Sequence, residues 1–281
     1  MDWKRTKTIF ILTFLVLNLF LGYQLYMKVN KNKLQNLVEQ PLEKKLADKH
    51  ISYKGTIPAY DQKETLISGQ RYTFTTDEVK ELKAKDILVD DTDEGNTLVF
   101  ELKKPLGLAK SNEKKIDELE SFIKDHSSRG DEYEFFKFDK EDNVVWFSQM
   151  YQDKQIFVDT NPMVGTNAVA EKNTAEQPSG TIKCELDEKG NLIRFTQTYI
   201  SVMRQGAPQE IISPKKALGR LLNTNHLVKG DSIQHIVLGY YSLANVEDVQ
   251  VYAPTWSIET EDAHYLVNAI DSSVQKLEGK Q

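Results

Sequence analysis

The hydrophobic pattern of the chain changes sharply after its first segment. Residues 8–27 carry no charged side chain, and Lys7 and Lys28 bound this apolar run. At about 1.5 Å per residue, a helix of this length spans roughly 30 Å, the thickness of a bilayer's hydrocarbon core. A cleaved signal peptide has a shorter apolar core ending at a small-residue site, and no such site follows here. The pattern predicts a transmembrane helix over 8–27, a short cytoplasmic tail over 1–7, and an extracytoplasmic body.

One face of the predicted helix combines apolar, polar and small residues. Helical spacing places on a single stripe the residues Ile11, Phe14, Asn18, Gly22 and Leu25. An amide in hydrocarbon costs free energy unless it finds a partner, and a glycine one turn away lets a second backbone come close. The stripe is therefore a candidate partner-binding face. The alternative is that a plain anchor tolerates one asparagine.

The residues after the apolar run become polar and rich in lysine. Over 28–50, apolar residues recur at helical spacing on both sides of Pro41. A proline inside a helix removes a backbone donor and clashes with the preceding turn. This segment is therefore predicted to be a juxtamembrane helical stalk, kinked or broken near Pro41.

From residue 51 onward, strand-like segments and short amphipathic helices predict an α+β body. Ser111 is expected to begin a helix that ends at His126, and Thr76 is the expected N-cap of a shorter helix. Later, Ser213 and Pro214 have the chemistry of an N-cap and a first helical turn. Strands are expected at 71–74, 97–102, 133–138, 144–151, 155–158, 181–186, 192–203, 233–243, 249–258, 265–269 and 274–277.

Residues 161–180 are the most loop-like stretch of the body, rich in Asn, Thr, Gly, Pro, Ala and Glu. They place the expected boundary between two antiparallel-sheet-plus-helix domains, 51–160 and 161–281. Segment 138–151 also aligns without gaps to 186–199, with Asp, Asn, Phe, Gln and Tyr at matching positions. Either the two domains arose by duplication, or two β-hairpins of similar chemistry match by chance.

Charge and cysteine content narrow the range of partners. The chain has 36 Lys and Arg residues against 42 Asp and Glu, a net charge of −6. An anionic body without a basic patch argues against nucleic acid as a partner. The single cysteine, Cys184, excludes an intrachain disulfide, and its alternation with Ile182 and Leu186 predicts a buried strand position.

The sequence contains no motif typical of catalysis or metal binding. Its five histidines lack zinc-ligand spacing, and neither a phosphate-binding glycine loop nor a nucleophile motif is present. Residues 90–101 have the acidic spacing of an EF-hand loop, but the strand-like pattern after Gly95 favours an acidic turn between strands. We therefore expect no cofactor, no metal and no enzymatic activity.

The opening segment, Met1-Asp-Trp-Lys-Arg-Thr-Lys-Thr-Ile-Phe-Ile11, closely resembles the start of the YycI (WalI) family. Chain length, the single N-terminal helix and the hairpin segments 147–151 and 195–199 extend the resemblance over nearly the whole chain. Residues 213–278 also look like a PepSY-type module, a helix followed by antiparallel strands, although Ser272 or Ser273 stands where that module usually has glycine.

The family resemblance implies a function. Proteins of the YycI family are membrane-anchored, non-enzymatic regulators of the WalK/YycG sensor histidine kinase, which controls cell-wall metabolism. They work with a YycH-like accessory protein and contact the kinase through transmembrane helices. Two other functions remain open at this point: an anchored cell-envelope binding or assembly module, and an anchored enzyme acting on wall polymer.

Overall fold

A computed structural model describes residues 3–34, 42–83, 88–92, 95–158, 180–246 and 249–277. The chain forms two compact units, Met1–Ile51 and Ser52–Gln281. The first unit contains helices α1 (Trp3–Leu34) and α2 (Leu42–Asp48). The predicted transmembrane segment thus lies inside a longer helix. Within the predicted stalk over 28–50, α1 continues to Leu34 and α2 begins at Leu42. Pro41 lies outside the described residues, and the stalk with its break stays a prediction.

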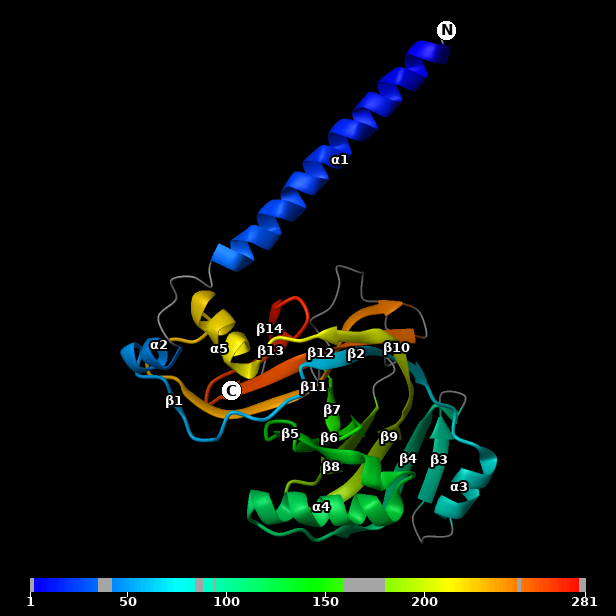
Figure 1. Cartoon of the computed structure of the whole chain (residues 1–281). Helices are drawn as coiled ribbons and strands as arrows, with labels where there is room; N and C mark the ends of the chain where they lie inside the picture. Colours follow the sequence, from blue (N-terminus) through cyan, green and yellow to red (C-terminus); the bar gives the residue numbers. More distant parts are fainter. Residues whose placement is uncertain are drawn as a thin grey trace. The chain divides into compact units, whose positions relative to one another are not determined.

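The second unit, called the body below, is a mixed α+β structure, and its class confirms the prediction (Figure 1). Among its described strands all pairings are antiparallel except β1 with β11 and β7 with β11. Its described helices include α3 (Thr76–Lys83), α4 (Asn112–His126), the 3₁₀ helix η2 (Gly130–Glu132) and α5 (Pro214–Asn223). Its strands are β1 (Ser52–Tyr53), β2 (Lys63–Arg71), β3 (Leu88–Thr92), β4 (Thr97–Leu106), β5 (Tyr133–Asp139), β6 (Val144–Tyr151), β7 (Lys154–Phe157), β8 (Thr181–Leu186), β9 (Leu192–Thr198), β10 (Ile200–Glu210), β11 (Ser232–Val246), β12 (Val249–Thr260), β13 (His264–Asn268) and β14 (Val274–Leu277).

The strands form two sheet regions joined through β7. The first sheet has the order β5-β6-β8-β9-β4-β3, and the second contains β10-β2-β12-β11 with β1, β13 and β14 at its margins. Strand β7 pairs with β6 of the first sheet and with β11 of the second. Strands from both halves of the sequence therefore mix in both sheets. The predicted domain boundary within 161–180 lies almost wholly outside the described residues and stays a prediction.

Helix α4 covers the first sheet and completes its core. Leu119 and Ile123, one turn apart, are fully buried against this sheet. Beneath them Phe100 of β4 and Phe195 of β9 stack face to face, with ring centroids 4.1 Å apart. The interpretation of Cys184 is confirmed, since its side chain is buried in the same cluster. Alternating apolar residues of the first sheet thus form the face against which the apolar stripe of α4 packs.

The second sheet is built around β12, which is buried along most of its length. Trp256 is fully buried and donates its indole N–H to the carbonyl of Ile212, 2.9 Å away. A proline in a central strand would remove a ladder hydrogen bond, yet Pro254 lies here. On the edge of β12 away from β11, pairing with β2 ends at Tyr252 and pairing with β13 begins at Thr255. Pro254 therefore sits between two ladders, where that edge has no strand partner.

Local capping explains where the helices of the body begin. Ser213 accepts a hydrogen bond from the Lys216 N–H, which confirms it as the N-cap of α5. The cap of α3 was predicted one residue too late, because Thr75 rather than Thr76 bonds the Glu78 N–H. Ser111 does occupy the N-cap position of α4, but its side chain makes no capping hydrogen bond.

Two strand predictions were wrong. A strand was expected at 71–74, but β2 ends at Arg71. Tyr72 and Phe74 therefore lie beyond the ladder. The strand expected over 192–203 is two strands, because Tyr199 interrupts the ladder between β9 and β10. In the acidic segment 90–101, Asp90, Asp91 and Thr92 belong to β3, and Thr97 begins β4 and pairs with Thr92. This strand pairing agrees with the interpretation favoured over an EF-hand loop, although residues 93 and 94 lie outside the described residues.

Candidate functional site

Helix α1 is the first candidate site. Among the described residues it is the one helix long and apolar enough to cross a membrane, with its candidate span at Lys7–Gln24. Its apolar side chains lie exposed, Phe10 by 74% and Phe14 by 64%, which is the state expected of a surface that lipid would cover. Thr13 donates its hydroxyl to the Ile9 carbonyl at 2.8 Å, so its polar group is satisfied within the helix.

The structure brings most of the predicted stripe together. Ile11, Phe14 and Asn18 line one shallow groove on the helix surface, which also includes Phe10, Leu15 and Leu19. An added Cβ at Gly22 would meet nothing within 4 Å, so this position is open to a second backbone. The side chain of Leu25 lies outside those described. Unlike Thr13, the Asn18 amide has no hydrogen-bond partner among the described residues.

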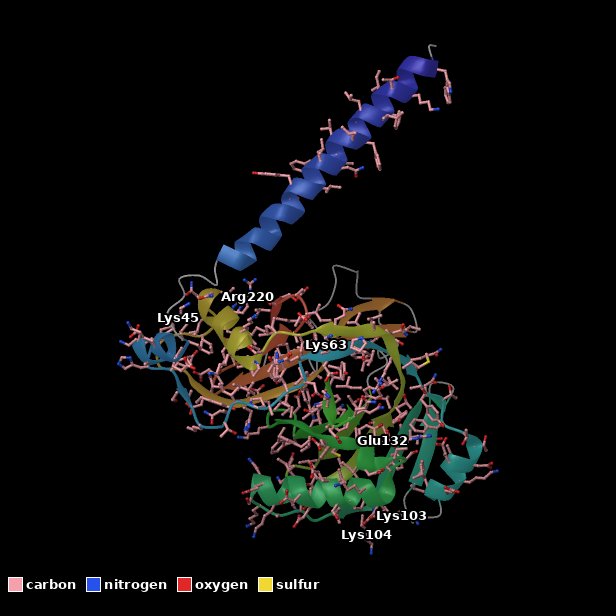
Figure 2. All side chains as sticks on the ribbon, in the orientation of Figure 1. Lys45, Lys63, Lys103, Lys104, Glu132 and Arg220 are labelled. Carbon is pink, nitrogen blue, oxygen red and sulfur yellow. The ribbon has the colours of Figure 1, made fainter. Side chains whose placement is uncertain are left out.

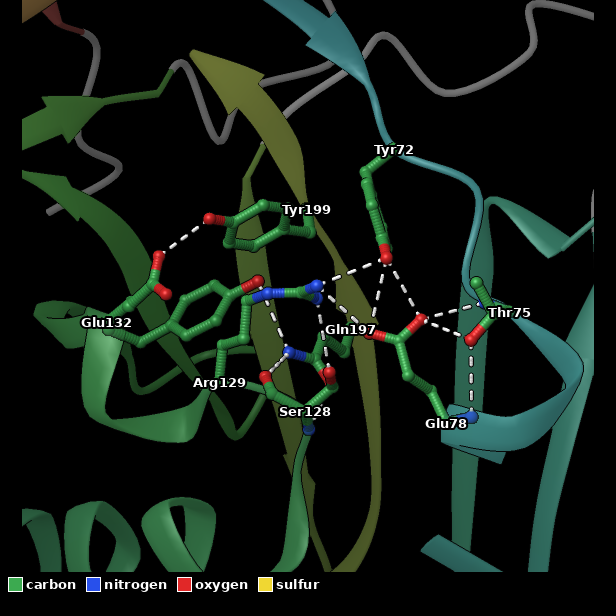
Figure 3. A network of polar contacts seen from close by, with 9 residues as sticks. Tyr72, Thr75, Glu78, Ser128, Arg129, Glu132, Gln197 and Tyr199 are labelled. Carbon is green, nitrogen blue, oxygen red and sulfur yellow. Dashed lines mark hydrogen bonds and ion pairs between the residues drawn. The ribbon is translucent and has the colours of Figure 1, made fainter. Parts of the chain in front are cut away.

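A second candidate site lies in the body, where two strands leave one sheet for the other (Figure 3). The chain passes from β2 of the second sheet through Tyr72 toward α3, and from β9 of the first sheet through Tyr199 into β10. At this junction the Tyr72 N–H donates to the Tyr199 carbonyl at 2.9 Å. The side chains of these two tyrosines enclose Arg129, and we call this group the Arg129 clamp.

Arg129 lies between the two tyrosine rings. Its guanidinium carbon is 4.5 Å from the ring centroid of Tyr72 and 4.8 Å from that of Tyr199. One guanidinium nitrogen forms an ion pair with Glu78 at 3.0 Å and donates to the Tyr72 hydroxyl at 3.1 Å. The backbone of Arg129 is left-handed, with φ of 50°, a conformation that costs free energy for a residue with a Cβ. The surrounding contacts hold it in this conformation (Figure 3).

Glu78 connects the clamp to the start of α3. Its carboxylate accepts the Thr75 N–H at 2.8 Å, while the Thr75 hydroxyl accepts the Glu78 N–H at 3.3 Å, which is a capping box. Burial alone would raise the pKa of Glu78. Hydrogen bonds from Thr75 and Tyr72 and the charge of Arg129 outweigh burial and lower that pKa. The carboxylate therefore stays ionised and keeps α3 attached to the clamp.

Two buried glutamines satisfy backbone groups beside the clamp. The Gln197 amide accepts the Ser128 N–H and donates to the Ser128 carbonyl. The Gln149 amide accepts the Ile200 N–H and donates to the Ile200 carbonyl, both at 3.0 Å. Each side chain thus replaces the peptide group of a missing strand neighbour. These are the glutamines that coincide in the two aligned hairpin segments, so equivalent residues make equivalent contacts.

The clamp is suited to holding elements of the body together. Its polar groups bond one another, and burial, followed by the hydrogen bond to Glu132, raises the pKa of Tyr199. Among the described residues no three His, Cys, Asp or Glu side chains are placed to hold a metal ion. Arg129 was not predicted from the sequence. The Thr-x-x-Glu spacing of Thr75 and Glu78 was the available sign of the capping box.

The fold and these sites define a class of protein: a mostly antiparallel α+β body that follows, within the described part of the chain, one candidate membrane helix. A family model described as "YycI protein" matches residues 29–270. The chain belongs to the YycI family. This is a regulatory accessory family, and membership gives the chain a role associated with a WalK-type sensor kinase. The matched region covers the body up to residue 270 and leaves out β14 and the candidate membrane span.

Several solved structures are similar at low sequence identity. YycH from Bacillus subtilis aligns over 76% of this chain and 53% of its own, with 12% identity and a TM-score of 0.38. The C-terminal domain of YpeB from Bacillus megaterium aligns over 74% of this chain and 99% of its own, with 14% identity and a TM-score of 0.42. An uncharacterized protein from Eubacterium rectale aligns over 81% and 84%, with 10% identity and a TM-score of 0.41. No curated protein matches the sequence.

Proposed function

We propose that this protein is a membrane-anchored, non-enzymatic regulator of a WalK/YycG-like sensor histidine kinase that controls cell-wall metabolism. Membership of the YycI family over residues 29–270 is the observation that carries the proposal. Helix α1 serves as the anchor, residues 1–7 lie in the cytoplasm, and the body lies outside the cell. The kinase and a YycH-like accessory protein are the partners.

The mechanism of this proposal depends on one face of α1. In a bilayer the Asn18 amide gains free energy by bonding a polar group of a neighbouring helix, and Gly22 lets that helix approach. A regulator shifts a kinase between two states only if its contacts differ in free energy between them. The stripe Ile11, Phe14, Asn18, Gly22 and Leu25 would make those differential contacts.

In-membrane crosslinking tests the partner and the face together. A photoreactive residue replaces Asn18 in one variant and Leu17, on another side of the helix, in a matched control. We expect the kinase to be captured from position 18 and not from position 17. Capture of nothing from either position would leave α1 as a plain tether and remove the helix-contact mechanism.

A signalling assay separates the mechanism from the fold. Asn18→Leu and Gly22→Leu are expected to change the output of a kinase-dependent promoter, whereas Leu17→Ala is not. Protease resistance of the body should be the same in all three variants, because all three substitutions lie in α1. Unchanged output in both face variants would refute the role of the stripe.

A further inference from the structure

Helix α5 has one apolar and one basic face. Its buried side chains hold it on the second sheet and are Ala217, Leu218, Leu221 and Leu222. Its exposed charged side chains are Lys215, Lys216 and Arg220, and the helix contains no Asp or Glu. The chain beyond residue 27 has 33 basic and 41 acidic residues, a net charge of −8. A purely basic helix face is therefore unusual for this protein.

The basic face is exposed, and one of its side chains is fixed. Lys216 and Arg220 are four residues apart and so are neighbours on the helix surface. Arg220 donates its Nε–H to the Ser272 carbonyl at 3.1 Å, which holds the guanidinium beside the turn between β13 and β14. At Gly219 an added Cβ would meet nothing within 4 Å. Asp271 of the same turn accepts the Ser273 N–H at 2.8 Å. The basic residues of α5 outnumber this single carboxylate, so the surface keeps a net positive charge.

The loop that follows α5 adds an exposed apolar residue. Val228 is 56% exposed and precedes the exposed Lys229. Leu227 is fully buried, and the Val228 N–H donates to the Asp231 carboxylate at 2.8 Å, so the loop has a fixed conformation. An apolar side chain beside basic residues is the composition of segments that lie at a membrane interface.

We propose that the basic face of α5 and the Val228–Lys229 loop dock on the anionic phospholipid headgroups of the membrane that holds α1. Lysine ammonium groups and the arginine fork are suited to phosphate oxygens. Each Lys or Arg near an anionic membrane surface strengthens binding by about fivefold, so Lys216 and Arg220 together supply roughly twenty-five-fold.

The covalent tether makes this modest attraction sufficient. The chain between Leu34 and Ser52 extends by at most about 3.5 Å per residue, so the body stays near the bilayer in which α1 would lie. Docking is then an intramolecular step with a high effective concentration. Charges act over about 8 Å at physiological salt, so docking requires close contact and weakens as salt rises.

Energy transfer from α5 to the lipid surface tests the proposal in the full chain. A donor dye is attached at Asn223→Cys on the exposed side of α5, and acceptor lipids are placed in the bilayer. Cys184 is fully buried and burial raises the pKa of its thiol, so it competes poorly for the dye. We expect stronger transfer in a bilayer of phosphatidylcholine and phosphatidylglycerol than in phosphatidylcholine alone, with the difference lost at high salt.

Matched variants identify the surface. Lys215→Gln, Lys216→Gln and Arg220→Gln together should abolish the difference between the two bilayers. The control replaces three exposed lysines elsewhere, Lys104, Lys110 and Lys114, by Gln and should keep it. Figure 2 shows Arg220 and Lys104 at opposite ends of the body.

Three results would overturn the proposal. One is equal transfer from the unaltered face in both bilayers. Another is an equal loss in the control variant, which would mean that overall charge rather than the α5 face is responsible. The third is tight binding of soluble polyphosphate without any dependence on phosphatidylglycerol, which would assign the face to a polymeric anion instead of the membrane. None of these readouts involves the kinase, so the regulatory proposal stands or fails separately.

Discussion

Replacing Arg129 by alanine is expected to destabilise the body by roughly 2–3 kcal/mol. The change removes two cation–π contacts, each worth about 0.5–1 kcal/mol at a partly exposed site. It also removes the ion pair with Glu78. The two side chains are 31% and 23% exposed, so solvent screening limits this pair to about 1 kcal/mol. The loss would appear in denaturant unfolding of the full chain in detergent, followed by the fluorescence of buried Trp256.

The left-handed backbone of Arg129 provides an internal control. Glycine adopts positive φ without the steric cost of a Cβ, so Arg129→Gly should be more stable than Arg129→Ala by about 1 kcal/mol. A double-mutant cycle with Glu78→Gln then isolates the ion pair. If Arg129→Ala unfolds within about 0.5 kcal/mol of the unaltered chain and glycine is no better than alanine, the clamp does not stabilise the junction as described here.

Three further changes test other parts of the body. Burial and the nearby Lys137 lower the pKa of His264 to about 4, below its ordinary value of about 6.5, so the folded state resists protonation. The free energy of unfolding should therefore fall by about 1.4 kcal/mol per pH unit as pH drops below 6.5, and His264→Gln should flatten this slope between pH 7 and 5. Gly130→Ala should cost about 1–3 kcal/mol of stability because the added Cβ would lie 2.7 Å from the Lys124 Cα in the preceding turn. Gly219→Ala, where an added Cβ meets nothing within 4 Å, should be neutral or stabilising by up to about 1 kcal/mol, and equal unfolding midpoints for the two variants would contradict this. Gln197→Leu should leave both backbone groups of Ser128 unpaired and cost at least about 2 kcal/mol, a loss that amide hydrogen exchange at Ser128 would report.

Elements defined by local chemistry were predicted well from the sequence. Helix α5 begins where Ser213 and Pro214 place it, and strands β6, β8 and β14 have the predicted bounds. The failures involve distant partners. Tyr72 and Phe74 resemble strand residues because they are aromatic, yet they serve the clamp and the core, and strand β2 before them was not predicted because its partners come more than a hundred residues later.

The candidate sites also differ in whether local sequence or distant partners determine them. Spacing alone placed Ile11, Phe14 and Asn18 on one face of α1, because a continuous helix has a fixed period. The Arg129 clamp depends on segments near residues 72, 129 and 199 meeting in space, and no local pattern encodes that meeting. Its glutamines were visible only as a coincidence between two hairpins, without an assigned role.

The pairing of β2 with β10 and β12 has a consequence for biogenesis. Ribosomes deliver the chain from its N-terminus, so Lys63–Arg71 emerges well before its ladder partners in Ile200–Glu210 and Val249–Tyr252, which come more than a hundred residues later. Such high contact order slows folding and leaves an apolar segment uncovered during synthesis. A truncation that removes β12 would also strip β2 and β11 of their shared neighbour. The second sheet therefore depends on the synthesis of β12, and a nascent or shortened product that lacks it offers unpaired strands to chaperones and proteases.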